Sequence, residues 1–496
     1  MNGRREFLKR LGIISAGSLL ADKIIANPYN PVHIFPNQYN YVKIKGAVKS
    51  GGKSLKGVSV TDGQSVVQTS GDGTFEIISS NQHRFVYISI PSGYLVNQNE
   101  TGTALFYKRI KPNQNNEMFV EFDLTKNSNE DNEHSFLLMA DPQTRTKDDI
   151  KLYFDSLVPD IKKTASQFAK ENLFGLACGD IMWDKLEFYP EYEKSVKEFG
   201  IPCFQVLGNH DCDVLARTDE QSAVTFMDHF GPTYYSFNKG EIHYVVLDDI
   251  FYFGDYFGYL DQKQLDWLKQ DLSFVENGKT VVVFTHIPAY NKQHERQGFT
   301  EPNPGLVVVN RELLYKILEP YKSFIITGHM HESEYLTDGG SEIHVCGAVC
   351  GAWWTGPICN DGTPNGYLVY NAKGSGLSWQ YKSAGFDINH QMRVYKKGNI
   401  KESPDKILAN IWTVDKNWEV NWYEDGMKKG RMERILTNDP LAIELQLGKD
   451  LPKKIPAVEP VFTDHILSAE VAGSGKEIIV EAIDRWGRIY TERIII

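Results

Sequence analysis

The chain has 496 residues, of which 41% are hydrophobic and 24% charged, and its formal net charge is -11. This length exceeds what one ordinary hydrophobic core serves, and the composition is that of a globular protein. The negative balance disfavours a protein whose main task is to bind nucleic-acid backbones, because such proteins present basic surfaces. We therefore expect several globular domains and no specific nucleic-acid binding.

The first residues are typical of an export signal. Arg4 to Arg10 form a basic segment, and a short apolar run from Leu11 to Ala21 follows it. That run is shorter than the roughly 20 residues that span a bilayer. The order Arg-Arg-x-Phe-Leu-Lys resembles a twin-arginine signal, with a basic amphipathic helix as the alternative. We expect an export signal over 1–26, a linker over 27–40, no transmembrane segment in the mature chain, and a periplasmic or cell-surface location.

Short alternating strands are predicted over residues 41–125. Apolar and polar residues alternate in 41–48, 57–63 and 71–77, and Gly-Gly or Asp-Gly turns separate these runs. Such spacing predicts a small β-sandwich. The order Gly-Val-x-Val-Thr-Asp-Gly resembles carboxypeptidase-regulatory-like or transthyretin-like modules, which implies a spacer or docking role. The polar run 126–133 indicates a domain boundary.

Strands and helices alternate over residues 134–385, which indicates a further domain. Continuous apolar strands bounded by helical patterns indicate buried sheets covered by helices. The expected strands are 136–140, 174–178, 203–207, 281–285 and 324–327, and the expected helices are 148–170 and 192–199. Beyond residue 386 the sequence predicts strands alone, 443–447 among them, in a β-rich domain over 386–496.

Five polar motifs each follow an apolar strand directly. They are Ala140-Asp141-Pro142-Gln143, Cys178-Gly179-Asp180, Leu207-Gly208-Asn209-His210-Asp211, Thr285-His286-Ile287-Pro288 and Thr327-Gly328-His329-Met330-His331. In sheets of this type, ligands gather at the carboxyl ends of the strands, so these side chains should meet. Carboxylates, an amide oxygen and imidazoles suit two divalent metals, with Asp180 as the natural bridge. The adjacent glycines are expected to let the backbone turn sharply.

The order Gly-Asp, Gly-Asn-His-Asp, His and Gly-His-x-His resembles that of the calcineurin-like metallophosphoesterases over about residues 134–385. This resemblance implies an α/β fold, an αββα-type sandwich of paired mixed sheets, which two small β-sandwich domains would flank here. It also implies hydrolysis of a phosphomonoester or phosphodiester by water that two divalent metal ions activate. The metals would be Mn, Fe, Zn or Mg.

The resemblance also implies a role for each motif residue. One metal would be held by Asp141, Gln143, Asp180 and His331, and the other by Asp180, Asn209, His286 and His329. His210 would assist the phosphate or the leaving group, and Asp211 would orient the His210 ring. The family usually has histidine where Gln143 stands, and a glutamine oxygen is a harder and weaker ligand. The alternative reading is an extracytoplasmic binding protein with a degenerate metal site.

Several weaker candidates remain open. Trp353 and Trp354 either wall the site and stack on an organic leaving group, or form a packed aromatic corner. Asp184, Asp248 and Asp249 are expected to support the site or lie on the surface, and 251–257 forms either a lid or core. Most of the six cysteines are expected to be buried thiols, with one disulfide feasible. The substrate would be a phosphorylated small molecule, lipid or surface polymer, and the oligomeric state is open.

Overall fold

The computed structural model describes residues 41–399, 404–447, 455 and 458–496. The predicted export signal and linker lie outside these residues. Within the described part, no helix is both long enough and apolar enough to cross a membrane.

The N-terminal region forms two four-stranded sheets that share one core. One sheet has the order β2-β1-β5, with β8 parallel to β1, and the other has the antiparallel order β4-β3-β6-β7. Ile44 of the first sheet and Val60 and Val86 of the second belong to one buried cluster, as a sandwich requires. The strands are β1 Tyr41–Ser50, β2 Lys53–Ser54, β3 Ser59–Thr61, β4 Val66–Gln68, β5 Thr74–Ser80, β6 Phe85–Ile88, β7 Tyr107–Arg109 and β8 Glu117–Asp123.

Two mixed sheets follow. The first has the order β11-β10-β9-β20-β21, in which β11, β10 and β9 are parallel and the last two strands are antiparallel. Its strands are β9 Glu133–Met139, β10 Leu173–Cys178, β11 Cys203–Val206, β20 Gly366–Lys373 and β21 Gly376–Ser383. The second has the order β12-β13-β16-β17-β19-β18, with an antiparallel pair at each edge. Its strands are β12 Tyr235–Lys239, β13 Ile242–Val246, β16 Thr280–Phe284, β17 Lys322–Thr327, β18 Glu334–Asp338 and β19 Ser341–Val345.

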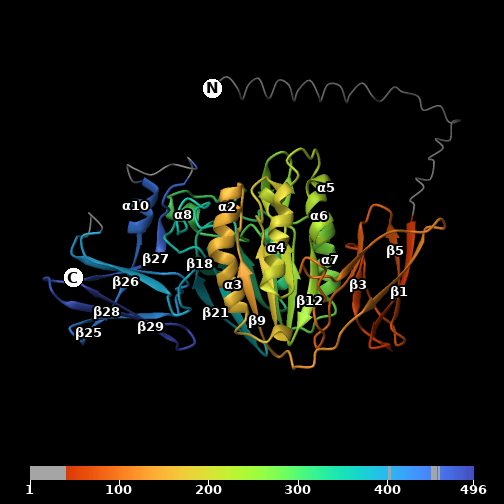
Figure 1. Ribbon diagram of the computed structural model, residues 1–496, viewed down its shortest axis with the longest axis horizontal. Coiled ribbons are helices and arrows are strands. Elements are labelled where there is room, and N and C mark those ends of the chain that lie inside the picture. Colours follow the sequence, from red (N-terminus) through yellow and green to blue (C-terminus); the bar gives the residue numbers. More distant parts are fainter. Residues whose placement is uncertain (1–40, 400–403, 448–454, 456–457) are drawn as a thin grey trace, which may run out of the picture. The chain divides into compact units, whose positions relative to one another are not determined.

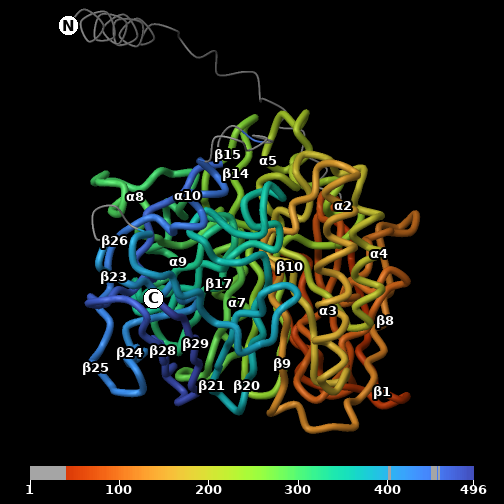
Figure 2. The backbone as a smooth tube through the Cα atoms, turned by 60° about the vertical axis from the view of Figure 1, so that its left-hand side comes forward, coloured from red at the N-terminus to blue at the C-terminus, as the bar shows by residue number. Residues whose placement is uncertain are grey.

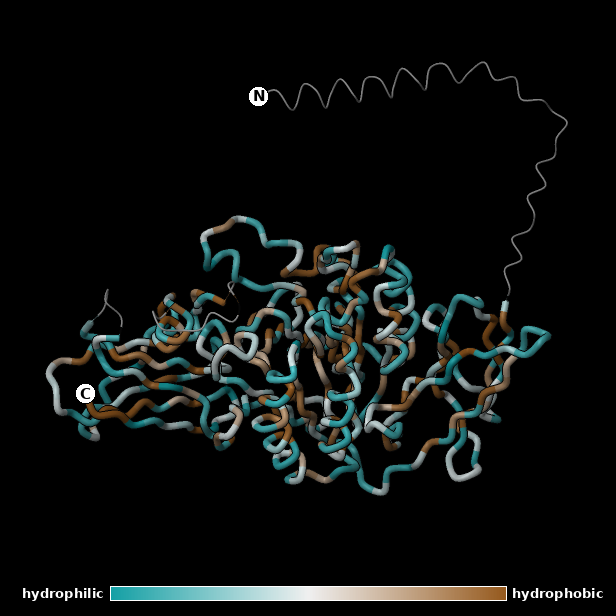
Figure 3. The backbone as a smooth tube through the Cα atoms, turned by 45° about the horizontal axis from the view of Figure 1, so that its top comes forward, coloured by the Kyte–Doolittle hydropathy of each residue, from teal (hydrophilic) through white to brown (hydrophobic). Residues whose placement is uncertain are grey.

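Alternation along the strands shows how the layers are stacked. In β9, Leu137 and Met139 pack with Ile161 and Val196 of the helices, while Phe136 points to the opposite face. The same alternation in β16 sends Phe284 towards the first sheet and Val283 towards helices α7 and α9. Both faces of each sheet are therefore buried, which confirms the predicted αββα-type sandwich. In Figure 3, hydrophobic stretches (brown) alternate with hydrophilic ones (teal) along the backbone.

Helices cover the outer faces of both sheets, and α2, α3 and α4 lie together over the first sheet (Figures 1 and 2). The helices are α2 Lys147–Leu152, α3 Val158–Ala165, α4 Tyr189–Phe199, α5 Asp219–Ser222, α6 Val224–Phe230, α7 Gln262–Leu272, α8 Gln293–Arg296 and α9 Arg311–Leu318. The predicted helix 148–170 is interrupted by a π-helical turn, Tyr153–Leu157, and ends at Ala165. Pro159 follows that turn and lacks the amide that a continuous α-helix would use there.

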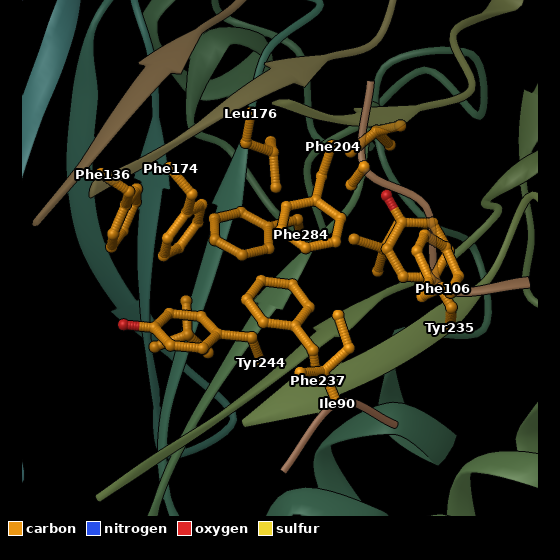
Figure 4. Close-up of a cluster of buried hydrophobic side chains, with 14 of the residues drawn as sticks. Ile90, Phe106, Phe136, Phe174, Leu176, Phe204, Tyr235, Phe237, Tyr244 and Phe284 are labelled. Atoms are coloured by element: carbon orange, nitrogen blue, oxygen red, sulfur yellow. The ribbon is translucent and has the colours of Figure 1, made fainter. Parts of the chain in front are cut away.

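An aromatic layer fills the space between the two mixed sheets (Figure 4). Phe204 of the first sheet stacks on Phe237 of the second, with ring centroids 4.1 Å apart and planes 6° apart. Phe174 meets Tyr244 edge to face at 5.4 Å. Phe106, which follows β6, joins this layer by packing 5.9 Å from Phe204. The layer therefore ties the N-terminal sandwich and both mixed sheets into one core.

The C-terminal region forms two antiparallel four-stranded sheets around a separate core. Their orders are β22-β23-β27-β26 and β25-β24-β28-β29. The strands are β22 Met392–Tyr395, β23 Lys406–Ile411, β24 Glu419–Glu424, β25 Met427–Arg431, β26 Glu433–Thr437, β27 Thr463–Glu470, β28 Glu477–Ile483 and β29 Ile489–Ile495. These sheets confirm the second predicted β-domain.

The predicted strand over 443–447 is wrong, because Pro440–Leu447 forms helix α10. Asp439 Oδ1 accepts a hydrogen bond from the amide of Ala442, 3.0 Å away, and Pro440 begins the helix. An aspartate cap followed by proline is a helix start, whereas a short apolar run by itself fits a strand or a helix equally well.

We expect Phe237→Ala to lower the free energy of unfolding by about 3 to 5 kcal/mol, because it empties the centre of the aromatic layer. Phe253→Ala is the matched control: the Phe253 side chain is exposed, and its loss should cost less than about 0.5 kcal/mol. Urea unfolding followed by circular dichroism measures both. Equal small losses would contradict the role given to this layer.

Candidate metal centre

The two sheets bring the five motifs to one edge. Asp141, Asp180 and Asn209 follow β9, β10 and β11 of the first sheet, while His286 and His329 follow β16 and β17 of the second. These five strands are parallel within their sheets, so their carboxyl ends coincide. The first sheet therefore contributes oxygen ligands and the second contributes imidazoles.

His286 lies at the centre of the cluster and is fully buried. Its Nε2 atom is 3.2 Å from Asp180 Oδ1, 3.1 Å from Asn209 Oδ1 and 3.2 Å from Nδ1 of His329. The ligand atoms of Asp180, His286 and His329 all lie within 4.8 Å of one another. Nε2 of His331 lies 3.7 Å from Asp141 Oδ1 and forms a second carboxylate–imidazole pair. The spacing of Asp180, His286 and His329 suits a divalent cation between them.

One ring nitrogen of each imidazole is hydrogen-bonded to a backbone carbonyl. The contacts are His286 Nδ1 to Cys178 O at 3.0 Å, His329 Nε2 to Gly305 O at 2.9 Å, and His331 Nδ1 to Gly351 O at 2.5 Å. A carbonyl only accepts hydrogen bonds, so the nitrogen facing it carries the proton. The opposite nitrogen of each ring then faces the cluster, where it can bind a cation. The three rings are thus oriented as ligands by the backbone.

Charge balance in the cluster also suits a cation. Burial lowers the pKa of His286, but the Asp180 and Asp141 carboxylates and the Cys178 carbonyl together raise it by more, to about 10. Burial lowers the pKa of His329 to about 3 and that of His331 to about 4, so both rings are neutral near pH 7. Burial raises the pKa of Asp141 to about 8. The cluster therefore holds protons that divalent cations would displace, and its carboxylate and imidazole donors fit divalent metal ions.

Backbone strain is concentrated in these residues. Left-handed backbone is rare for residues other than glycine, and it gathers at functional sites. Five of the seven predicted metal ligands adopt it: Asp141 (φ 50°), Gln143 (φ 40°), Asp180 (φ 46°), His329 (φ 72°) and His331 (φ 51°). Among the adjacent glycines, Gly179 also has left-handed backbone. A Cβ at Gly208 would lie 2.0 Å from the amide nitrogen of Asp180. Gly208 therefore lets the Asp180 backbone pack against it and does not make the sharp turn that the sequence suggests.

Gln143 occupies the position where histidine is usual. It is buried, and its Nε2 atom donates to Asp180 Oδ2 at 3.1 Å while Cys350 Sγ lies 3.8 Å from its Oε1 atom. The two amide atoms exchange places on a half-turn of the side chain, which would aim Oε1 at the cluster. With the amide turned, Oε1 of Gln143 would face Asp180, so the structure leaves the predicted ligand role of Gln143 open.

His210 lies at the rim of the cluster, and its partner differs from the predicted one. Its Nδ1 atom contacts Asp184 Oδ1 at 2.9 Å, so Asp184, and not Asp211, orients the ring. Asp211 is fully buried and accepts instead from the amides of Ile181 (3.0 Å) and Met182 (3.1 Å). Its oxygens also accept from Gly208 N and the Tyr189 hydroxyl, both at 3.1 Å. Asp211 thus fixes the loop that carries Asp180.

Two further residues support the cluster. Asp249, which is fully buried, accepts a hydrogen bond from the amide of His286 at 3.0 Å. It follows the apolar strand β13, the same signal that marks the five motifs. Asp248 accepts from the amide of Ile250 at 3.2 Å and so shapes the adjoining turn. Both aspartates have the supporting roles that the sequence indicates.

The aromatic candidates divide between the site and the core. Trp354 is buried, and its Nε1 atom donates to Pro142 O at 3.1 Å, so it belongs to a packed corner. Trp353 stacks on His331 with ring centroids 4.2 Å apart. In the hairpin of β14 Ile250–Tyr252 and β15 Tyr256–Gly258, Tyr256 meets the His329 ring at 5.8 Å.

All six cysteines are buried free thiols, as expected for most of them.

The chain resembles known proteins in sequence. It matches the calcineurin-like phosphoesterase family over 134–333, and the families described as N terminal and C terminal of calcineurin-like phosphoesterase over 42–127 and 343–490. Purple acid phosphatase 15 of Arabidopsis thaliana is 30% identical over 146 residues, which are 27% of this chain and 25% of that protein. The match thus spans about a quarter of the length of this curated relative.

Solved structures also resemble the chain at low identity. A dimetal phosphatase from Danio rerio is 14% identical, with a TM-score of 0.34, and the match covers 50% of this chain and 96% of that one. A purple acid phosphatase from seeds of yellow lupin (Lupinus luteus) is 12% identical, with a TM-score of 0.38, and the match covers 66% of this chain and 67% of that one.

The two aspartates near His210 should differ in their effect on stability. Asp211→Ala leaves three buried amides and a hydroxyl without an acceptor, so we expect a loss of about 3 kcal/mol or more in the free energy of unfolding. Asp184→Ala removes an exposed carboxylate and should cost less than about 1 kcal/mol. Urea unfolding of the metal-free proteins compares them, and equal losses would contradict this assignment.

Gln143→His should raise the affinity for the metal proposed to bind beside Asp141, because imidazole is a stronger ligand for Zn²⁺ than an amide oxygen. Gln143→Ala should lower that affinity. Isothermal titration of the metal-free proteins with Zn²⁺ and Mn²⁺ measures both changes. Unaltered affinity and stoichiometry in both variants would show that Gln143 is not a ligand.

Proposed function

The chain belongs to the calcineurin-like phosphoesterase family, and on this premise we propose that it hydrolyses phosphoesters with two divalent metal ions. The observation that carries the proposal is the orientation of His286, His329 and His331. A backbone carbonyl holds one nitrogen of each ring. The other nitrogen faces Asp180 and Asn209 in His286, Asp141 in His331, and the His286 ring in His329. Oriented imidazoles of this kind are typical of metal ligands.

The ligand set divides between two cations. Asp141, Gln143 and His331 would hold one, Asn209, His286 and His329 would hold the other, and Asp180 would be shared. When bound, such cations supply Lewis acidity to a phosphoryl group and to water. Oxygen-rich ligation on the Gln143 side favours Mn²⁺ or Mg²⁺ there over Zn²⁺.

His210 is the residue that we propose moves a proton. It is only partly buried, so a substrate can reach its ring. Burial lowers the pKa of His210, but Asp180 and Asp184 raise it by more, so the net shift is above its ordinary value. Asp184 holds Nδ1, which leaves Nε2 to donate a proton to a phosphate oxygen or to the departing alkoxide. Asp184 would act by positioning this ring.

The proposed setting is outside the cytoplasm. The basic and apolar residues between Arg4 and Ala21 support export, and export would give access to phosphorylated small molecules, lipids or surface polymers. Monoesters and diesters both fit chemistry of this type.

We expect the purified protein to hydrolyse 4-nitrophenyl phosphate or bis(4-nitrophenyl) phosphate when Mn²⁺ is added, and to lose turnover when a chelator removes the metal. His286→Ala and Asp180→Ala should each lower kcat by at least about 100-fold, because each removes a ligand. His390→Ala is the matched control, since that ring stacks on Phe386 away from the motifs.

A protein that binds two metals yet turns over neither substrate, nor a broader phosphoester panel, would contradict the proposed hydrolysis. A protein that binds fewer than two metals and shows no turnover would be the binding protein with a degenerate site.

A further inference from the structure

An arc of aromatic rings borders one side of the metal centre. Trp183 lies 5.4 Å from the His210 ring, and Trp353 stacks on His331 at 4.2 Å. The two indoles face one another at 6.0 Å, with an interplanar angle of 44°. The arc therefore joins the residue proposed to move a proton to a proposed metal ligand, and any leaving group near His210 would lie beside it.

The two indoles are available to a ligand. Both are only partly buried, unlike Trp354. Neither indole N–H has a hydrogen-bond partner among the described residues, whereas Trp354 donates to Pro142 O. A missing partner alone does not distinguish them, because the buried Trp267 and Trp379 also lack one. Their partial exposure beside His210 and His331 is what makes both indoles available.

The backbone under Trp353 is strained and firmly held. Trp353 has a φ of 50°, which is unfavourable for a bulky residue. Its amide donates to Gly351 O at 3.0 Å, and the amide of Trp354 donates to Cys350 O at 2.9 Å. A Cβ on Gly351 would lie 2.0 Å from Asn365 Oδ1, so the turn also depends on a glycine. The loop thus fixes the backbone of Trp353, and the stack on His331 orients its indole.

Arg145 places a positive charge at the same rim. Its guanidinium carbon lies 5.1 Å from the centroid of Trp183, and it has no carboxylate partner within the residues that the structure describes. The contact stabilises the indole through the ring quadrupole. The exposed charge also favours the approach of an anionic phosphoester.

We propose that Trp183 and Trp353 form a platform that binds a planar aromatic ring in the alcohol part of the substrate. The inference rests on the proposed phosphoester hydrolysis and narrows its substrate class to esters with such a ring near the phosphate. Two indoles inclined at 44° let a ring stack on one of them and meet the other at an angle, which are the arrangements that aromatic pairs prefer. Saturated groups of equal bulk lack this preference.

The test compares 2-phenylethyl phosphate with 2-cyclohexylethyl phosphate. The two alcohols have similar acidity and size, so the ratio of their kcat/KM values reports ring recognition and not leaving-group chemistry. We expect wild type to favour the phenyl ester, and Trp353→Leu and Trp183→Leu each to lower that ratio about fivefold. Trp353→Phe should retain most of it. A general loss of activity, for example from a displaced His331, cancels in the ratio.

Trp486→Leu is the matched control, because Trp486 is also partly exposed and lies in the turn between β28 and β29, against Trp379 of β21. It should leave the ratio unchanged. A wild-type preference for the cyclohexyl ester, or a ratio that neither Trp353→Leu nor Trp183→Leu alters, would overturn the platform.

Failure of the proposed hydrolysis gives a different result. In that case wild type turns over neither ester, and binding of 2-phenylethylphosphonate and 2-cyclohexylethylphosphonate to the Mn²⁺-loaded protein decides the inference by isothermal titration. Tighter phenyl binding that Trp353→Leu abolishes supports the platform. Equal affinities, or no binding of either phosphonate, overturn it.

Discussion

The contact between the two mixed sheets is the constraint on which the metal centre depends. The first sheet supplies Asp141, Asp180 and Asn209, and the second supplies the three histidines, so neither sheet holds a complete site. The aromatic layer sets the separation of the sheets, as in the stack of Phe204 on Phe237 at 4.1 Å. Small residues then let the loops meet: a Cβ on Gly179 would lie 2.2 Å from His286 Nδ1. A core interaction thus determines the distances between ligands.

Hydrogen bonding and charge prepare the same cluster for cations. Backbone carbonyls hold one nitrogen of each imidazole ring and so orient the ring. The negative charge of the carboxylates is balanced by bound protons, chiefly the proton of His286, which the Asp180 carboxylate stabilises. Burial keeps His329 and His331 neutral, the state in which imidazole binds a metal. The left-handed backbone at these residues is unfavourable by itself, and the rigid sheets on either side hold it in place.

The C-terminal sheets support the loop that carries the Trp353 platform. This loop connects β19 to β20 and so crosses from one mixed sheet to the other. His465 of β27 contacts Asp361 Oδ2 at 2.9 Å, and Asn410 of β23 donates to the Asp361 carbonyl at 2.9 Å. The amide of Asn360 donates to the His331 carbonyl at 3.1 Å. The C-terminal region is therefore connected to a proposed metal ligand through a few buried contacts.

The sequence by itself determined the layered fold and the residues that gather at the site, because strand periodicity and polar residues at strand ends are local signals. It left the contacts of those residues open. Tertiary structure alone decided that Asp184 holds His210 while Asp211 anchors the Asp180 loop, since adjacency in the chain does not say where a side chain points. It also decided that Trp354 is core and that Trp353 borders the site. Each of these depends on partners distant in the chain, whereas the helix at Pro440 has a local signal, Asp439 followed by proline, which the apolar run by itself does not reveal.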